Sequence, residues 1–275
     1  MNKENLLISI ITPTFNRGRY LEECILSIKN QDYKNIEHII IDGGSTDNSL
    51  EIIKKYEKTY NLKWISEKDN GCADAMEKGF QMATGYIFCW LDSDDFYLPN
   101  TIEKIIKVFT KNPKIDVVFG DMLICDLNSK IIDYTKKTTF DREALIYSQM
   151  VVNPQTTFWK SDLHKKIGGI NRKYLRCGDY DFFCKMAISN AKFYHIRDFL
   201  AVYRSHSEQL TKSLDICNAE TKEINQKYYD KNISDFGIKI KKTKIWIKRV
   251  FYFLIQGDIW YVVRSILIKI GFIHI

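Results

Sequence analysis

Two acidic clusters stand directly after apolar, strand-like runs in this chain of 275 residues. The first begins at Asp42, after residues 39–41, and the second spans residues 92–95 (DSDD), after residues 87–91. Ligands of open parallel sheets bind beyond the carboxyl ends of the strands, so both clusters are expected to line one crevice. Carboxylates spaced one residue apart suit a hard divalent cation that also holds phosphate oxygens. The spacing therefore predicts an enzyme site for a nucleotide diphosphate held through a divalent metal ion.

Alternating strand-like and helical patterns up to about residue 112 should position these clusters. Strands are predicted at residues 7–12, 36–41, 62–66 and 86–91, and amphipathic helices at 20–30, 45–60, 72–83 and 100–110. Ser45, Thr46 and Asp47 are the cap residues expected at the start of the second helix. This alternation is typical of βαβ units, which build a parallel sheet. We therefore expect an α/β fold with a mostly parallel central sheet flanked by helices.

The alternation becomes less regular past residue 112. Further strands are predicted at 116–125, 130–134 and 193–203, and further helices at 142–147, 161–167 and 182–189. A chain of this length can bury one substantial core. We therefore expect one domain over residues 1–225, in which 1–112 and 113–225 form the two sides of a cleft.

The seven cysteines show neither a Cys-x-x-Cys pair nor a regular spacing, so free thiols in a reducing compartment are expected. The first residues lead directly into a strand-like run and lack the apolar stretch and cleavage site of a signal peptide. A cytoplasmic location is the expectation from both observations.

The last segment, residues 226–275, differs in composition from the rest. From about residue 238, aromatic and aliphatic side chains alternate with Lys and Arg, which contribute to a formal net charge of +7. Charged residues interrupt every apolar run before the roughly 20 residues that spanning a bilayer requires. We expect a basic amphipathic helical tail that lies on an anionic surface, at the inner face of the cell membrane. The alternative is a tail that packs on the body; no nucleic-acid-binding module accompanies it, so no nucleic acid partner is expected.

Several further segments accompany the acidic clusters: residues 8–17 (ISIITPTFNR), 41–47 (IDGGSTD), 66–85, 177–183 (CGDYDFF) and 202–206 (VYRSH). Over roughly residues 6–215, the chain resembles the family 2 inverting glycosyltransferases of the GT-A fold, especially bacterial enzymes that assemble surface polysaccharides. The resemblance implies a Rossmann-like sheet with a donor half at 1–112 and an acceptor half at 113–225. It also implies sugar transfer from a nucleotide diphosphate, with UDP expected, to a hydroxyl of a glycan or a lipid-linked oligosaccharide. A homo-oligomer is compatible with it.

The resemblance assigns roles to individual positions. The residues expected to contact the donor are Thr12, Pro13, Thr14, Phe15, Asn16, Asp42, Asp69, Asp74, Asp92 and Ser93. Asp94 and His206 are the expected ligands of the metal, Mn²⁺ or Mg²⁺, and Gln155 and Tyr180 are expected beside the acceptor. Asp179 is the expected general base, which removes the proton of the acceptor hydroxyl as that hydroxyl attacks the anomeric carbon. Attack from the face opposite the diphosphate inverts the configuration.

Two positions depart from the family pattern. Gly43 stands where many members carry a second Asp, and Gly178 replaces a Glu before Asp179. These departures keep open a membrane-tethered scaffold that binds a nucleotide sugar without turning it over. A sugar-phosphate nucleotidyltransferase would need a Gly-rich loop after the first strand, and a haloacid-dehalogenase phosphatase would need its Asp-x-Asp there, so both fit less well. Asp47 is expected to cap a helix, and Glu67 and Glu77 to be solvated surface charges.

Overall fold

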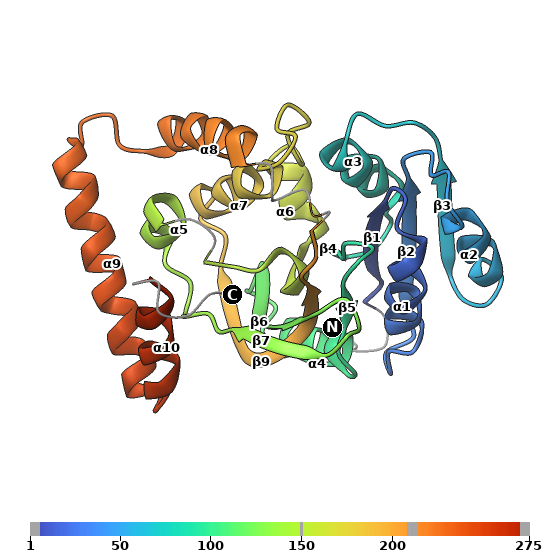
Figure 1. Ribbon diagram of the computed structural model, residues 1–275, viewed down its shortest axis with the longest axis horizontal. Helices are drawn as coiled ribbons and strands as arrows, with labels where there is room; N and C mark the ends of the chain where they lie inside the picture. Colours follow the sequence, from blue (N-terminus) through green and yellow to red (C-terminus); the bar gives the residue numbers. More distant parts are fainter. Residues whose placement is uncertain (1–5, 149–150, 208, 210–213, 270–275) are drawn as a thin grey trace.

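Figure 1 shows the computed structural model of the protein, which describes residues 6–148, 151–207, 209 and 214–269. One sheet runs through it in the order β3-β2-β1-β4-β8-β6-β9-β5, with β7 paired to β6. Its first four strands are parallel: β1 (Ile8–Thr14), β2 (Ile36–Asp42), β3 (Leu62–Ser66) and β4 (Ile87–Trp90). The order of strands reverses at β1, so a crevice is expected where β1 and β4 end.

Helices cover both faces of this parallel part, which explains why β1, β2 and β4 are buried along their length. Ile39 and Ile41 of β2 belong to the core that includes α3 (Cys72–Met82), whereas Ile40 packs with α1 (Gly18–Lys29) and α2 (Ser49–Tyr56). A Cβ at Gly79 of α3 would lie 2.4 Å from Ile11, so α3 sits very close to the strands. The α2 helix starts later than predicted, because residues 42–47 form a loop of their own.

The second half of the sheet is mixed, so the prediction of a mostly parallel sheet holds only for the first half. The strand β8 (Thr157–Lys160) runs antiparallel to β4 and to β6 (Val117–Cys125), and β9 (Phe193–Arg204) runs parallel to β6. The strands β7 (Ile131–Thr135) and β5 (Phe96–Tyr97) pair antiparallel with β6 and β9. The sequence pattern does not indicate β5 and β8, because two and four residues are too few to show a period.

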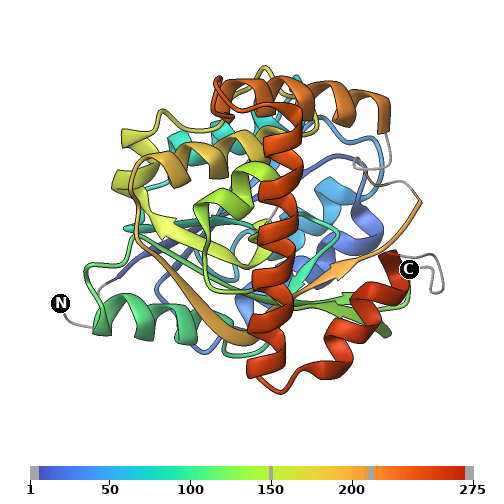
Figure 2. The same cartoon turned by 90° about the vertical axis from the view of Figure 1, so that its left-hand side faces the viewer.

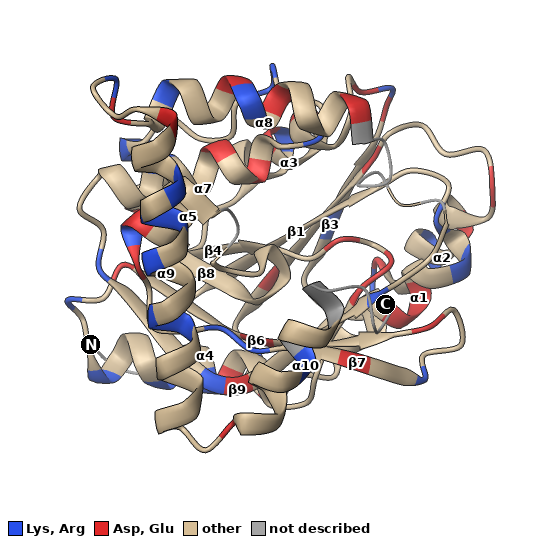
Figure 3. Ribbon diagram, turned by 60° about the vertical axis from the view of Figure 1, so that its left-hand side comes forward, with Lys and Arg blue, Asp and Glu red and all other residues tan. Residues whose placement is uncertain are grey.

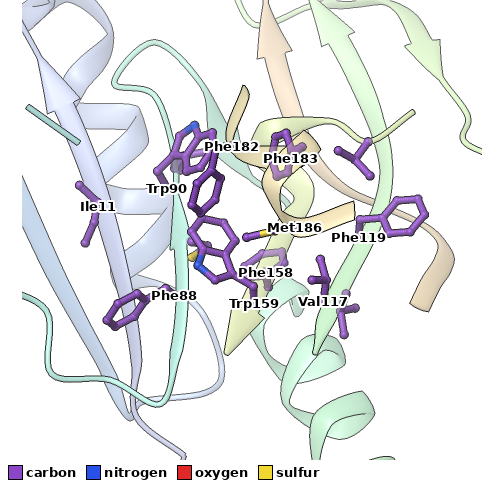
Figure 4. Close-up of a cluster of buried hydrophobic side chains, with 14 of the residues drawn as sticks. Ile11, Phe88, Trp90, Val117, Phe119, Phe158, Trp159, Phe182, Phe183 and Met186 are labelled. Atoms are coloured by element: carbon purple, nitrogen blue, oxygen red, sulfur yellow. The ribbon is translucent and has the colours of Figure 1, made fainter. Parts of the chain in front are cut away.

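Aromatic side chains join the two halves of the sheet to α7 (Gly178–Ile188), as Figure 4 shows. The ring centroid of Trp90 on β4 lies 5.3 Å from that of Trp159 on β8 and 5.7 Å from that of Phe183 on α7. Phe182 lies 5.1 Å from Trp159 in an edge-to-face arrangement, which aromatic pairs prefer. This packing fixes the first turn of α7 near the end of β4. The helix begins at Gly178 rather than at residue 182 as predicted.

The remaining helices cover the second half. They are α4 (Thr101–Lys111), α5 (Arg142–Ser148), α6 (Ser161–Lys166), α8 (Leu214–Tyr228), α9 (Asp235–Ile255) and α10 (Ile259–Lys269). The predicted domain boundary at 225/226 falls inside α8, which packs on α7. Figure 2 shows α9 running down one side of the molecule with α10 turned back beside it. Among the described residues, every helix lacks the combination of length and apolarity that crossing a bilayer needs.

Candidate active site

Asp42, the last residue of β2, organises the first acidic loop. Its carboxylate accepts hydrogen bonds from the backbone N–H groups of Gly44 and Ser45, at 3.1 and 3.0 Å. It also accepts from the hydroxyls of Ser45 and Ser66. The side chain is fully buried, so these bonds replace water around its charge. Through these hydrogen bonds, Asp42 fixes the conformation of the loop that follows β2.

The turn that follows β1 is tied to this loop. Asn16, at φ 52°, accepts a hydrogen bond from the Thr46 N–H at 2.8 Å and donates its own N–H to the Ser45 hydroxyl at 2.8 Å. Thr14 carries a buried hydroxyl that bonds to none of the described residues, and the neighbouring Phe15 ring is 56% exposed. The turn therefore offers a free polar group and an exposed aromatic face at the end of β1.

Position 43 requires glycine because Asp69 lies close to its backbone. A Cβ at Gly43 would lie 2.7 Å from the Oδ2 atom of Asp69, which follows β3. The other oxygen of Asp69 accepts from the Gly71 N–H at 2.8 Å, which keeps this carboxylate against the first loop. A side chain at position 43 would displace Asp69, so glycine lets the ends of β2 and β3 approach each other.

The second acidic cluster follows β4 and is joined to residues from three other parts of the chain. Asp92 accepts a hydrogen bond from Gln155 Nε2 at 3.1 Å. Asp94 Oδ2 lies 2.8 Å from His206 Nε2 and 3.8 Å from Arg17 Nε. The structure thus brings Asp92, Asp94, Gln155 and His206 together. Arg17 was missed by sequence reasoning, and its only signal is a positive charge directly after the first strand.

A buried arginine holds this cluster in place. Arg204 of β9 donates through Nε to the Asp94 carbonyl at 2.9 Å and through its backbone N–H to Asp95 Oδ1 at 2.8 Å. Its guanidinium pairs with Glu23 and lies 5.0 Å from the ring centroid of Tyr20. Because the planar fork of Arg makes several fixed bonds at once, it can lock the backbone of the cluster. Sequence reasoning also missed Arg204.

Asp179 approaches the second cluster from the second half of the chain. It lies in the first turn of α7, and its carboxylate accepts from the Tyr180 N–H at 2.7 Å. Burial raises the pKa of Asp179 to about 6, although a helix N-terminus favours the charged form. Burial, together with the nearby charges of Asp94 and Asp179, raises the pKa of Asp92 to about 7.

Cys72, the first residue of α3, marks where these groups converge. Burial raises the pKa of its thiol, and so do the charges of four carboxylates, those of Asp92, Asp179, Asp94 and Asp69. Two loops and one helix therefore direct four acidic residues towards the start of α3. They come from both halves of the chain, as the predicted cleft requires.

The side chains at this point can be tested for a metal site. Asp94 and His206 offer a carboxylate oxygen and an imidazole nitrogen within 2.8 Å of each other. Across the part of the chain that the structure describes, no group of three His, Cys, Asp or Glu side chains forms a complete site. The Asp94 carboxylate suits a hard cation that takes its other ligands from diphosphate oxygens and water, whereas the His206 imidazole suits a transition metal ion better than Mg²⁺.

Two of the residues predicted to contact the ligands have buried side chains. Tyr180 is 4% exposed, and its hydroxyl lies 3.0 Å from the Ile146 carbonyl, so it faces the core rather than an acceptor. Thr12 is fully buried in a strand covered on both faces, and its hydroxyl lies 2.9 Å from His38 Nε2. The hydroxyls of both residues therefore lie against other groups of the protein.

Asp74 and Glu77 of α3 are tied to the segment before α7. Asp74 accepts from the Asn70 N–H at 3.1 Å and lies 3.1 Å from Arg172, and these contacts lower its pKa against the effect of burial. Glu77 accepts from the Ile170 N–H at 2.9 Å. The prediction of a solvated charge is therefore wrong for Glu77, which connects two elements of the body.

Asp47 and Glu67 agree with their predicted roles. Asp47 accepts hydrogen bonds from the N–H groups of Gly18 and Ser49, at 2.9 and 3.0 Å, and these residues begin α1 and α2. It therefore caps helices, because it satisfies backbone donors that helix ends leave open. The Glu67 side chain is 58% exposed and pairs with Lys78.

Sequence comparisons identify the family to which this chain is similar. The family model described as "Glycosyl transferase family 2" matches residues 9–179, which include both acidic clusters and Asp179. An uncharacterized glycosyltransferase of Rickettsia typhi is 31% identical over 220 residues, which cover 77% of this chain and 68% of the relative. One of Rickettsia bellii is 27% identical over 262 residues, 90% of this chain. This chain spans only 37% of the length of that second relative.

Solved structures share the fold. Staphylococcus aureus TarS 1–349 in complex with UDP-GlcNAc matches with a TM-score of 0.68 and 19% identity, over 90% of this chain and 73% of that chain. The mannosyltransferase PcManGT from Pyrobaculum calidifontis, in complex with GDP-Man and Mn²⁺, matches with a TM-score of 0.61 and 18% identity, over 88% and 69%. The sheet and its helices thus share the α/β fold of these two proteins.

Proposed function

The chain belongs to glycosyl transferase family 2, and we propose that it is an inverting glycosyltransferase whose donor is a UDP-sugar. The acceptor in this proposal is a hydroxyl of a glycan or of a lipid-linked oligosaccharide in surface polysaccharide synthesis. The proposal rests on the approach of the first turn of α7 to the start of α3, where a Cβ at Gly178 would lie 3.5 Å from that of Ala73. The charges of Asp69, Asp92, Asp94 and Asp179 all act on Cys72 at this point. Crowded carboxylates repel one another unless a cation or a proton neutralises them, so this arrangement suits a metal-bound diphosphate with a base beside it.

The donor would bind at the ends of β1, β2 and β4. In this proposal the nucleobase lies against Phe15 and bonds to the free Thr14 hydroxyl, while Asp42 and Asn16 keep the two loops in shape. Asp69 and Asp92 then face the ribose and the sugar. The preformed loops lower the entropy cost of binding, because the groups that contact the donor are already ordered.

Asp94 and His206 would hold the divalent cation, which when bound supplies Lewis-acid stabilisation of the charge on the departing diphosphate. Arg17 adds a fixed positive charge on the same side, 3.8 Å from Asp94. Arg204 keeps the backbone of Asp94 in place through its bond to the carbonyl. Asp94, His206 and Arg17 together orient the leaving group, and Arg204 supports Asp94.

Asp179 would remove the proton of the acceptor hydroxyl. Its pKa of about 6 suits this role, because a general base works best when its pKa is near the operating pH. Gln155, bonded to Asp92 between the two halves, is the proposed polar contact for the acceptor. Attack on the face opposite the diphosphate then inverts the anomeric carbon.

The test is a thermal-shift screen of UDP-sugars with Mn²⁺, followed by measurement of UDP release in the presence of a membrane glycolipid fraction. We expect one UDP-sugar to raise the unfolding temperature by mass action and to be consumed, and excess chelator to remove the turnover. A donor that raises the unfolding temperature but releases no UDP would contradict the proposal and favour a nucleotide-sugar-binding scaffold.

We also propose that α9 and α10 hold the protein on an anionic membrane surface. Part of the tail packs on the body, since Ile245 and Phe253 are buried and Lys241 pairs with Glu143. The tail nevertheless exposes large apolar residues, among them Trp246, Phe251, Ile255, Ile259 and Trp260. Figure 3 shows Lys and Arg along α9 as well. Exposed apolar and basic side chains together suit binding to anionic lipid.

Flotation with vesicles tests the tail. Wild type should float with vesicles that contain phosphatidylglycerol and not with purely zwitterionic ones, and a Trp246→Ser, Trp260→Ser double variant should float several-fold less. Leu127→Ser is the control, because Leu127 is exposed to a similar degree as Trp246 but lies outside the tail. Equal flotation of the double variant and wild type would contradict this surface.

A further inference from the structure

We propose that Glu220 of α8 is the positioning residue for Asp179, so that α8 completes the active site. This inference rests on the proposed function and extends it to a helix that lies beyond the matched segment, residues 9–179. In Figure 1, α8 lies directly over α7, the helix that carries the base.

One carboxylate receives three consecutive backbone N–H groups. Glu220 Oε1 accepts from Leu175 at 2.7 Å, and Oε2 accepts from Arg176 and Cys177, both at 2.9 Å. These residues lead directly into α7, which begins at Gly178. Hydrogen bonds to an ionised acceptor are about twice as strong as neutral ones, so the three bonds fix the direction in which the chain enters the helix.

Gly178 lies between Asp179 and the residues that Glu220 binds, and its flexibility is the reason that this segment needs Glu220. Gly178 has no side chain with which to hold the turn, and glycine allows more backbone conformations than any other residue. The space around it is ordinary, since a Cβ there would lie 3.5 Å from that of Ala73. Glu220 therefore supplies, from another helix, a carboxylate that restrains the backbone two residues before Asp179.

A second tie from α8 supports the first. The Cys177 thiol lies 3.5 Å from the Thr221 hydroxyl and 3.6 Å from the Cys217 carbonyl. In addition to burial, the charge of Asp179 raises the pKa of Asp92 after β4, of Cys72 on α3, and of Cys177 and Cys184 at α7. The charge of Glu220 in turn acts on Asp179. After burial, the negative charge of Glu220 raises the pKa of Asp179, so the anchor also tunes the base.

The test compares Glu220→Gln with Glu223→Gln in the full chain. Glu223 lies on the same helix but binds side chains, the Lys173 amine and the Tyr174 hydroxyl. Glu220→Gln should lower kcat between about 10-fold and about 100-fold with the donor KM unchanged, because a misplaced base costs rate rather than binding. The loss of activity of Glu220→Gln at acid pH should set in at lower pH than in wild type, because the negative charge that raises the pKa of Asp179 is gone. Glu223→Gln should match wild type in both respects.

Two further measurements separate geometry, charge and folding. Glu220→Asp keeps the charge but shortens the reach, so kcat should fall while the acid limb stays in place. Hydrogen exchange at the amides of residues 175–177 should be faster in Glu220→Gln than in wild type, whether or not a sugar is transferred. Wild-type kcat, pH profile and exchange in Glu220→Gln would overturn the inference. Sugar transfer by Asp179→Asn would instead overturn the proposed function.

Discussion

The two sides of the proposed site, the donor side at the ends of β1, β2 and β4 and the acceptor side at α7, are held together in different ways. On the donor side, Asp42 is bonded by Gly44 and Ser45 of its own loop and by Ser66 of the adjacent strand. On the acceptor side, the segment before Asp179 is bonded by Glu220, which lies more than forty positions along the chain. A binding loop can thus carry its own geometry, whereas the base depends on a distant helix. The variants below test this difference.

The largest effect on the donor side is expected for Asp94→Ala. Loss of the carboxylate should remove metal-dependent stabilisation of the leaving diphosphate and lower kcat/KM on the order of 10³-fold. Initial rates over a range of Mn²⁺ concentrations measure this. Glu67→Gln, which changes an exposed charge, is the control. Undiminished turnover of Asp94→Ala in excess chelator would show that the second cluster does not hold the metal.

Asp42→Asn should disturb the loop that follows β2 on the donor side. A buried carboxylate with several hydrogen bonds is replaced by an amide that can satisfy only some of them, at a cost of about 1–3 kcal/mol in the free energy of unfolding. Donor affinity should fall on the order of 10-fold, because the loop loses its shape. Urea unfolding and calorimetry with UDP measure both. A lower kcat with unchanged affinity and stability would assign Asp42 to the acceptor side.

Two glycines give a matched pair. Gly43→Ala places a Cβ 2.7 Å from Asp69 Oδ2, an overpacking that should weaken UDP binding roughly 10-fold. Gly178→Ala places a Cβ at an ordinary 3.5 Å from Ala73 and should change UDP binding less than about 2-fold. Calorimetry of both variants makes the comparison. Equal effects would mean that the two halves do not differ in how tightly they are packed around the donor.

The pH dependence of kcat/KM reports the acceptor side. Asp179 must be ionised to take a proton, and burial raises its pKa to about 6, so activity should rise with pH up to about 6 and then level off. Below this value, the rate should fall about 10-fold per pH unit. Measurements at saturating Mn²⁺ and donor prevent pH effects on the binding of either one from dominating the profile. An acid limb near 3.8, the ordinary value for Asp, would indicate that Asp179 is not the base.

The donor side could be predicted from the sequence because its determinants are local. Strand endings and nearby Gly, Ser and Asp residues identify the first loop, and Asp92 and Asp94 follow a recognisable apolar strand. The two patterns lie in the structure where the sequence places them, at the ends of β2 and β4. The parallel strands were also predicted, because long β-branched runs show a clear pattern.

The acceptor side was predicted less well because its determinants are distant or short. The strand β8 has four residues, too few to reveal a period, and it makes the sheet mixed. Tyr180 directly follows the base, yet it turns into the core, since neighbouring residues of a helix point in different directions. Arg204 and Glu220 act through backbone groups that only the folded chain brings near them.

The central claim is that Asp179 acts on the acceptor while the donor is held by other residues. The most direct measurement compares Asp179→Asn with wild type in Mn²⁺, using UDP release for turnover and calorimetry for donor affinity. We predict that kcat falls on the order of 10³-fold, because general-base catalysis is lost, and that the donor Kd changes less than about 2-fold. Retained turnover, or a loss of donor affinity that accounts for the loss of activity, would contradict the claim.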